Sequence, residues 1–401
     1  MRRPRRPGVN PLTAPLPMPP DMLRVGPLRA GAFRSALHEP AVAAALGTAL
    51  GVAFGTCFLT GLLSHYQQHP PAGIWWPTSP VWLYRVSQGL HVACGLASVP
   101  LLLAKLWTVY PKLFTWPPAR NLAHAAERAS VAVLVGSAVF QLATGVANIA
   151  RWYPWHFGFT QTHFLVAWVA IGALLVHIGA NVALARDSLR RPRPAPQAGP
   201  QSDGGVTRRS MLVGTAAAVG TVTVATVGQT LPGLSSVSAL APRLPGVGAQ
   251  GLPVNRSATA ARVRELATSG DFALALSGPS GSRVLTLAEV AAMRQRTHHL
   301  PISCVEGWSA GAVWTGVALR DLIALVGAPA RSRVLVESLE PAGAYRTSVV
   351  DPWHTEDPRT MLASHVHGEP LHVDHGYPLR LISPNRPGVL QTKWVTAMRV
   401  L

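Results

Sequence analysis

The sequence is poor in charged residues and in cysteine. Only 13% of its 401 residues are charged, whereas 48% are hydrophobic, which is too apolar for an ordinary soluble protein of this length. Three cysteines are too few for a disulfide framework. Cys57 and Cys94 stand within apolar runs, where a small buried hydrophobe is the simplest interpretation. Cys304 is the only cysteine in the C-terminal half and has no disulfide partner there, so its sulfur is either unreactive or has a chemical role.

Acidic residues are also scarce, and the formal net charge is +18. Such an excess is compatible with nucleic-acid binding, but no basic stripe is interleaved with aromatic residues. The basic residues instead gather beside apolar runs, at 105–128, at 186–209 and at the N-terminus. The N-terminal group consists of Arg2, Arg3, Arg5 and Arg6. This distribution is typical of a membrane protein, so we expect a lipid bilayer and no nucleic acid as partner.

Five apolar runs predict membrane-spanning helices, each of which needs about 20 residues. They cover 41–63, 86–104, 129–150, 162–185 and a weaker 211–231. The loops 64–80 and 152–162 contain no Lys or Arg, whereas the segments that alternate with them are basic. Since Lys and Arg stay on the cytoplasmic side, the N-terminus is expected inside and the chain from about residue 235 outside the cytoplasm.

The segment 186–255 reads as a linker around the fifth helix, because it is rich in Pro, Gly and Ser. Its TRRSML stretch, residues 207–212, resembles a twin-arginine export signal placed in mid-chain. The simpler alternative is an ordinary basic flank before a helix. Cleavage near Ala239 or Ala241 is conceivable, but a retained anchor is the expectation for an internal helix.

Histidines within the apolar runs are candidate functional groups, because an ionisable side chain in a membrane span is costly. His163 and His177 are fourteen residues apart, which returns to nearly the same helix face roughly 21 Å further along the axis. His91 has glycines close by in its own run, and His65 follows the first run. Imidazole binds haem iron strongly, and two axial histidines give an electron-transfer centre.

Histidines on the first, second and fourth spans of residues 41–185 resemble the membrane-bound b-type cytochrome subunits of formate dehydrogenases and hydrogenases. The resemblance implies haem b, with His65, His91, His163 and His177 as iron ligands. The pairing stays open, since His163 could join His65 or His91, and His177 could join His91. The alternative is that these histidines cap helices or bond neighbouring spans, in a haem-free anchor.

The C-terminal segment 256–401 lacks long apolar runs. Short apolar stretches alternate with turn residues, which predicts an α+β, strand-rich domain with helices near 286–295 and 317–327. About 145 residues are enough for one core.

Two blocks of this domain resemble the sulfite oxidase superfamily of molybdopterin enzymes. The first is LTLAEVAAM followed by LPISCVEGWSAGAVWTGVALRDLIALVGA, and the second is MLASHVHGEPLHVDHGYPLRLISPNRPGVLQTKWVTAMRV, from 361 to 400. The resemblance implies that Cys304 ligates molybdenum, that His375 and Arg380 contact the cofactor, and that Lys393 meets its pterin end. A thiolate is a soft ligand that suits this metal, and Arg can clamp a phosphate with two hydrogen bonds. Without the resemblance, a buried inert thiol, a turn histidine and two surface charges would be the simpler interpretations.

The residues after Cys304 bear on the substrate. Sulfite-oxidising members usually place arginines there, whereas this chain has Cys-Val-Glu-Gly-Trp-Ser, and the carboxylate of Glu306 would repel sulfite if it faced the pocket. The pattern is more similar to the periplasmic methionine-sulfoxide reductase catalytic subunits. Glu306 is therefore expected near the pocket, with reduction of a sulfoxide-like substrate as the favoured reaction. A second group of histidines reads mainly as solvated loop residues, with a zinc or copper site as the alternative. Its members are His354, His365, His367, His372 and His375.

The overall prediction is an all-α transmembrane bundle of four spans plus a fifth anchor helix, followed by a sulfite-oxidase-type molybdopterin domain. The expected domains are a cytoplasmic basic segment 1–40, a membrane domain 41–185, a linker with the fifth helix 186–255 and a catalytic domain 256–401. The chain would be a multi-pass protein of the bacterial inner membrane that exchanges electrons with a quinone or another membrane carrier through b haem. The alternatives are sulfite-oxidase-like oxidation, or a tethered domain that binds a ligand without catalysis.

Overall fold

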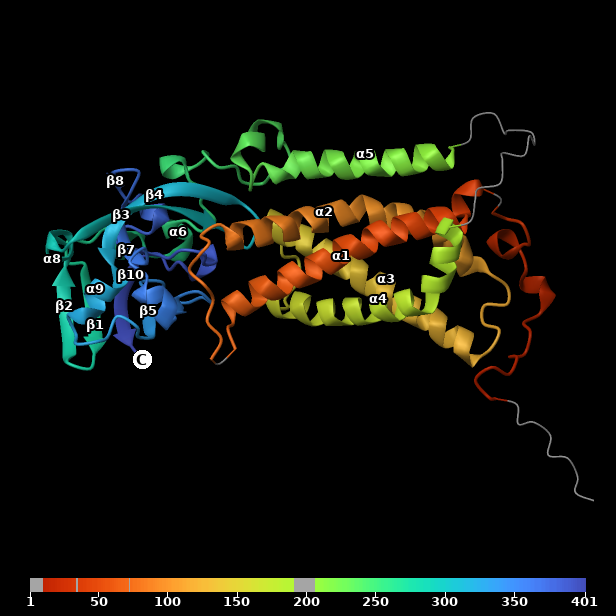
Figure 1. The fold of residues 1–401 in the computed structure, drawn as a ribbon, viewed down its shortest axis with the longest axis horizontal. Helices are drawn as coiled ribbons and strands as arrows, with labels where there is room; N and C mark the ends of the chain where they lie inside the picture. Colours follow the sequence, from red (N-terminus) through yellow and green to blue (C-terminus); the bar gives the residue numbers. More distant parts are fainter. Residues whose placement is uncertain (1–9, 34, 72, 191–205) are drawn as a thin grey trace, which may run out of the picture. The chain divides into compact units, whose positions relative to one another are not determined.

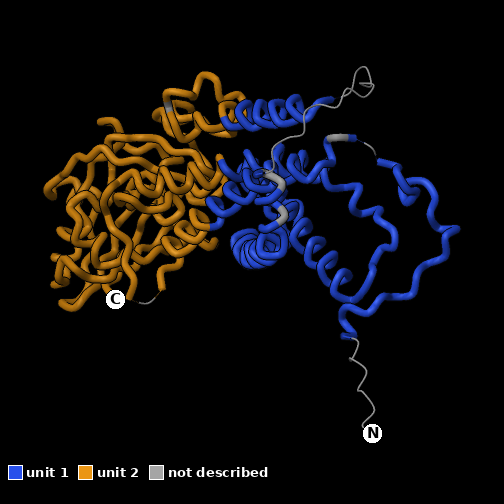
Figure 2. Tube along the Cα trace, turned by 45° about the vertical axis from the view of Figure 1, so that its right-hand side comes forward, with its two compact units in different colours: residues 1–58, 94–223 blue, residues 59–93, 224–401 orange. Residues whose placement is uncertain are grey.

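A computed structural model describes residues 10–33, 35–71, 73–190 and 206–401. The N-terminal arginine cluster and linker positions 191–205 therefore lie outside the described residues. The chain divides into two compact units (Figure 2). The first contains 1–58 and 94–223, and the second contains 59–93 and 224–401. The second unit thus combines parts of the first two long helices with the C-terminal domain.

Five helices of the described residues are long and apolar enough to cross a membrane (Figure 1). They are α1 (Pro40–Gln68), α2 (Leu83–Val109), α3 (Leu122–Ala150), α4 (Phe159–Arg190) and α5 (Arg208–Val227). The five predicted helices are confirmed, and most extend beyond their apolar runs. One consequence is that α1 continues past residue 63, so that His65 lies inside the helix instead of ending it.

Hydrogen bonds and apolar contacts link the long helices in the first unit. Asn121 caps the start of α3 by accepting from the backbone N–H of His124, and Gln141 of α3 donates to the carbonyl of His163 on α4. Val42 and Leu101 belong to a cluster that joins α1, α2 and α5. Close approach through small and polar residues is how helices associate where lipid removes the hydrophobic driving force.

The C-terminal part of the second unit contains one mixed sheet with the order β2-β1-β10-β5-β6. Its strands are β1 (Ala273–Gly278), β2 (Gly281–Thr286), β5 (Val334–Ser338), β6 (Thr347–Val350) and β10 (Val395–Val400). Strands β1 and β10 run parallel, and the other neighbours are antiparallel. The inward residues of β1 alternate with exposed ones, as expected for a strand with one face on a core.

A second, antiparallel sheet has the order β3-β4-β7-β8, and β9 also pairs with β7. Its strands are β3 (Gln295–Ser303), β4 (Ser309–Ala318), β7 (Met361–Val366), β8 (Glu369–Pro370) and β9 (Arg380–Ile382). Strands β3 and β4 form a long hairpin, and its turn carries Cys304. Cys304, Trp308 and Trp314 belong to the apolar cluster of this sheet.

Short helices complete the domain. They are α6 (Ala258–Ala261), α7 (Arg264–Ala267), α8 (Leu287–Ala292), α9 (Leu319–Ala324) and α10 (Pro352–Glu356). A capping box between Thr286 and Glu289 begins α8, and Leu322 of α9 is fully buried in the core of the first sheet. The predicted α+β architecture and the helices expected near 286–295 and 317–327 are confirmed.

Candidate active site

Cys304 occupies a tight, closed turn between β3 and β4. Its N–H donates to the carbonyl of Trp308 at 2.9 Å, and the N–H of Gly307 donates to the carbonyl of Cys304 at 3.0 Å. Gly307 has a φ of +95°, which favours glycine. The hydroxyls of Ser303 and Ser309 meet at 2.8 Å across the base of the turn. The thiol is therefore held on a rigid element, with the residue only 2% exposed.

The surroundings of the Cys304 thiol favour its protonated form when no metal is bound. Burial raises its pKa to about 12, and the nearby carboxylate of Glu306 acts in the same direction. Arg243 and the side-chain amide of Asn255, which donates to Sγ at 3.5 Å, oppose this rise. A thiol of this kind becomes a thiolate when a metal cation replaces the proton.

Glu306, predicted to lie near the pocket, is buried two residues beyond Cys304 and is paired. Its Oε2 accepts from Arg243 Nη1 at 2.8 Å and from Trp308 Nε1 at 3.2 Å. Arg243 precedes the domain in sequence, and no local motif distinguishes it, so it was not predicted. The charge expected to repel an anion is thus offset by a guanidinium at hydrogen-bond distance.

The three predicted cofactor contacts lie together around Gly376. A Cβ at Gly376 would lie 3.1 Å from Lys393 Cβ and 3.2 Å from Arg380 Cβ, so the missing side chain lets the two cations approach. Arg380 Nη1 donates to the carbonyl of His375 at 3.1 Å, and the guanidinium lies 5.6 Å from the ring centroid of Trp314. The structure therefore brings these residues, far apart in sequence from Cys304, into one region of the domain.

Burial shapes the electrostatics of this cluster. It lowers the pKa of His375 to about 4, with the positive charge of Arg380 as the second cause. It lowers the pKa of Arg380 to about 9 and that of Lys393 to about 7. The guanidinium of Arg380 lies over Trp314, and Trp314 belongs to the same apolar cluster as Cys304, so packed side chains connect the cation with the thiol. A buried group of cations is stabilised by an anionic ligand.

Unpaired polar atoms test whether a phosphate-bearing pterin cofactor fits here. Arg380 Nε is buried and has no hydrogen-bond partner among the described residues. A buried N–H without an acceptor is costly, more so on a charged group. A molybdopterin would supply phosphate oxygens as acceptors and dithiolene sulfurs beside a cysteine ligand. The donor set therefore fits this cofactor.

Residues before the domain cover the same region. The sequence predicts a flexible connector up to 255, but the carbonyl of Ala249 lies 2.6 Å from His375 Nε2, and the side chain of Gln250 bonds the backbone of His372 and of Pro370. Together with Arg243 and Asn255, these contacts make the end of the connector part of the site.

Two of the four predicted haem ligands share one local arrangement. His91 Nδ1 lies 3.2 Å from the hydroxyl of Thr60, and Gly61 faces its ring. In the other unit, His163 Nδ1 lies 3.1 Å from the hydroxyl of Thr144, and Gly145 faces its ring. Each of the two imidazoles thus has a hydroxyl partner at Nδ1 that orients its ring. In both cases the partner belongs to a Thr-Gly pair on the preceding long helix. Metal-ligating histidines usually have such a partner.

The other two predicted haem ligands have different neighbours. His65 stacks on His69, with ring centroids 4.9 Å apart. The backbone carbonyl of His177 accepts from the side chain of Asn181.

The histidines expected to be solvated loop residues have varied surroundings: His354 and His375 are buried, which contradicts that expectation, and the rings of His372 and His375 lie 6.3 Å apart. His354 Nδ1 bonds Asp351 Oδ2 at 2.6 Å, and His365 Nδ1 lies 2.9 Å from the Ser364 hydroxyl. No cluster of three or more metal-binding side chains occurs within the described part of the chain.

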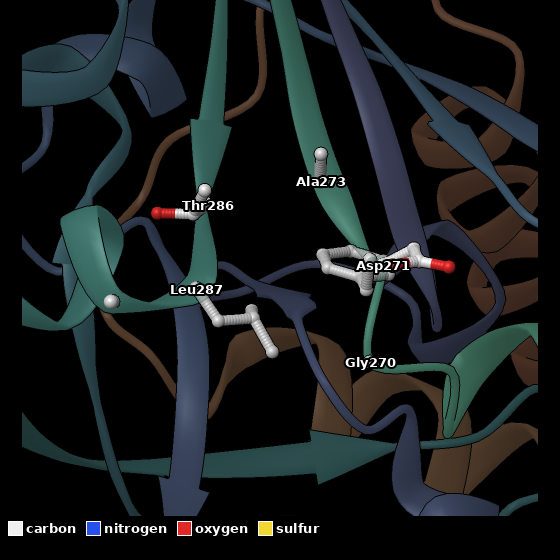
Figure 3. Close-up of a pocket in the computed structure, with 7 residues that line it drawn as sticks. Gly270, Asp271, Ala273, Thr286 and Leu287 are labelled. Atoms are coloured by element: carbon white, nitrogen blue, oxygen red, sulfur yellow. The ribbon is translucent and has the colours of Figure 1, made fainter.

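A surface hollow of ≈ 440 Å³ lies between the ends of β1 and β2 (Figure 3). It is lined by 270–273 and 286–288, among them Asp271 and Leu287, and contains none of the predicted site residues. Its lining offers no thiol, imidazole or cation.

Comparisons with known proteins agree with this assignment. Residues 261–401 match the family model described as the oxidoreductase molybdopterin binding domain. The chain is 32% identical over 139 residues to the putative protein-methionine-sulfoxide reductase subunit YedZ1 of Azospira oryzae, covering 34% of this chain and 52% of that protein. It is 28% identical over 155 residues to the mitochondrial sulfite oxidase of Drosophila melanogaster, covering 32% and 27%.

Further similarities extend to other proteins. The NADPH nitrate reductase of Neurospora crassa is 36% identical over 101 residues, which are 22% of this chain and 10% of that protein. The sulfane dehydrogenase SoxCD of Paracoccus pantotrophus has 23% identity and a TM-score of 0.30, covering 33% of this chain and 38% of that chain. The chain spans about half the length, or less, of the curated relatives named here.

Proposed function

Since residues 261–401 are a molybdopterin-binding oxidoreductase domain of the sulfite oxidase superfamily, we propose that the chain is a membrane-bound enzyme that transfers an oxygen atom outside the cytoplasm. The favoured reaction is reduction of a sulfoxide-like substrate. The observation that carries the proposal is the placement of Cys304 and the buried guanidinium of Arg380 around one apolar cluster, with Lys393 beside Arg380 at Gly376.

The residues of the domain have separate roles in this proposal. When bound, the cofactor supplies two-electron oxygen-atom transfer at molybdenum. The thiolate of Cys304 would ligate the metal, Arg380 and Lys393 would hold the anionic and pterin parts, and His375 would contact the cofactor. Glu306 stays near the reacting atoms, where Arg243 fixes its orientation.

The membrane half would supply electrons through b haem. The repeated threonine contacts of His91 and His163 support these two as iron ligands, and His65 and His177 are the further candidates. A quinol in the bilayer is the proposed donor. The TRRSML stretch would export the folded domain, and the bacterial inner membrane is the proposed location.

Oxidation of sulfite is the second candidate, and one observation favours it. The Glu306 charge, which would repel sulfite, is paired with Arg243, so an anion meets a nearly neutral pair. A tethered ligand-binding domain without catalysis is the third, and the retained Cys304 argues against it.

The first experiment measures metal and haem in one preparation. Detergent-purified protein is expected to hold molybdenum and to show a reduced-minus-oxidised spectrum of b haem. Cys304→Ser should change the Mo(V) EPR signal and keep the haem, because the protein's thiolate ligand is removed while the dithiolene sulfurs of the cofactor remain. Cys94→Ser is the matched control and should keep both. A Mo(V) EPR signal in Cys304→Ser equal to that of the unaltered protein would refute the assignment.

The second experiment identifies the reaction. Dye-coupled assays with methionine sulfoxide, dimethyl sulfoxide and sulfite distinguish reduction of a sulfoxide from oxidation of sulfite. Turnover of a sulfoxide without turnover of sulfite is expected, and the opposite result selects the second candidate.

A further inference from the structure

The turn that carries Cys304 is held by groups from outside the molybdopterin domain. Gln88 Nε2 of α2 donates to the carbonyl of Val305 at 2.6 Å. The Thr230 hydroxyl donates to the carbonyl of Gly307, and the carbonyl of Gln229 accepts from the N–H of Ser309 at 2.8 Å. These contacts lie within the second compact unit.

Helix α2 also packs directly against this turn. A Cβ at Gly307 would lie only 2.7 Å from Cγ2 of Val92, so the glycine allows backbone and helix to touch. Arg85 Nη2 donates to the carbonyl of Thr230 at 2.6 Å, and Gly89 lies against the same threonine. Gln88 is 5% exposed and Val92 7%, so the junction is closed to water.

The same part of α2 carries a candidate haem ligand. His91 is the chain neighbour of Val92, and it lies one helical turn from Gln88. Its ring is oriented by Thr60 on α1. Within one turn of helix α2, therefore, Gln88 and Val92 contact the cysteine turn and His91 carries the imidazole.

From this junction we infer that Gln88 and Val92 of α2 form the electron route between haem at His91 and the Cys304 turn. The inference rests on the proposed function. The route runs through the helix and the Gln88 side chain to the Val305 carbonyl, one residue from Cys304, and in parallel through Val92 to Gly307. Bonded and closely packed atoms couple redox centres better than a solvent gap.

The electron balance sets how the route is used. Reduction of a sulfoxide breaks the S–O bond and consumes two electrons and two protons, giving a sulfide and water. A quinol supplies two electrons and releases two protons on oxidation. Because a haem passes one electron at a time, each turnover uses the junction twice.

The test compares haem oxidation with turnover that bypasses the haem. Full-length Gln88→Leu and Val92→Ala, with Val86→Ala on the same helix as control, are purified with metal and haem quantified. Haem is reduced, and its reoxidation by dimethyl sulfoxide or by the substrate found above is followed by absorbance. The Mo(V) EPR signal reports on the cysteine turn, and a reduced dye that donates directly to the domain measures turnover.

We expect haem reoxidation to slow by about tenfold in Gln88→Leu, less in Val92→Ala and not in Val86→Ala. Dye-driven turnover, haem spectrum and EPR signal should stay near those of the unaltered protein. Unchanged haem reoxidation in both variants overturns the inference. An equal loss of dye-driven turnover together with an altered EPR signal also overturns it, because that result shows that the contacts only support the structure of the turn. Failure of the proposed function is distinct, because it shows as missing molybdenum or missing haem in the unaltered protein.

Discussion

Arg243 Nη1 and Glu306 Oε2 lie 2.8 Å apart, with side chains that are 19% and 7% exposed. The pair joins the connector that follows α5 to the turn of the molybdopterin domain. A buried carboxylate keeps its charge only when it is paired and hydrogen-bonded, and here the indole of Trp308 adds a second donor. The connector is therefore a structural component of the site.

Removing Arg243 should destabilise the protein, because Glu306 would remain buried and unpaired. We expect Arg243→Ala to lower the free energy of unfolding by roughly 3–5 kcal/mol. Denaturant unfolding in detergent, followed by tryptophan fluorescence, measures this. Arg346→Ala, which removes an exposed pair with Glu337, is the control and should cost at most about 1 kcal/mol. Equal losses of unfolding free energy in the two variants would show that the Arg243–Glu306 pair stabilises the protein no more than an exposed ion pair does.

Lys393 should make the stability of cofactor-free protein depend on pH. Burial lowers its pKa from 10.5 to about 7, so between these pH values the unfolded chain binds a proton that the folded chain does not. Stability should then rise with pH across this window, and the cost of charging this partly exposed lysine is fully present below it.

The matched variant is Lys393→Met, which should abolish this rise and make the cofactor-free protein more stable near neutral pH. Loaded protein should instead lose cofactor in the same variant. Unfolding midpoints measured from pH 6 to 10 test the prediction, with Lys112→Met as control. A rise of the same slope in Lys393→Met would contradict it.

The threonines beside His91 and His163 should affect haem retention. Thr60→Ala and Thr144→Ala each remove the group that orients an imidazole, which typically weakens metal binding by about 10–100-fold. Haem per chain after dialysis against a haem scavenger is the measurement. Thr48→Ala removes only a hydroxyl bonded to its own helix and should keep the haem. Haem retention equal to that of Thr48→Ala would exclude the orienting role.

The paired arginines at 208 and 209 provide a test of the export route. Arg208 pairs with Glu39 at 2.8 Å, and lysine can keep that ion pair. Changing both arginines to lysine should therefore leave the protein folded but keep residues beyond α5 inside the cell. Protease accessibility of the C-terminal domain in spheroplasts reports the side, and Arg190→Lys is the control. Accessibility in the double variant would show that the arginines act only as a basic flank.

The sequence by itself determined the elements that depend on local composition. Uncharged runs near the length of a bilayer specify long helices wherever they occur, which is why all five spans were predicted, although their ends moved by several residues. Cys304, His375, Arg380 and Lys393 were predicted as site residues because they stand in two blocks that resemble the sulfite oxidase superfamily. That identification came from the pattern of neighbouring residues and required no knowledge of distances.

Only the tertiary structure decided which distant groups meet these residues. Gln88 and Arg243 carry no local signature, and each reaches the Cys304 turn from a part of the chain read as a membrane span or a linker. Their partners are set by how helix α2 and the connector pack on the β3–β4 hairpin. Periodicity and spacing describe one segment at a time, whereas burial and pairing of a charge depend on every segment that surrounds it.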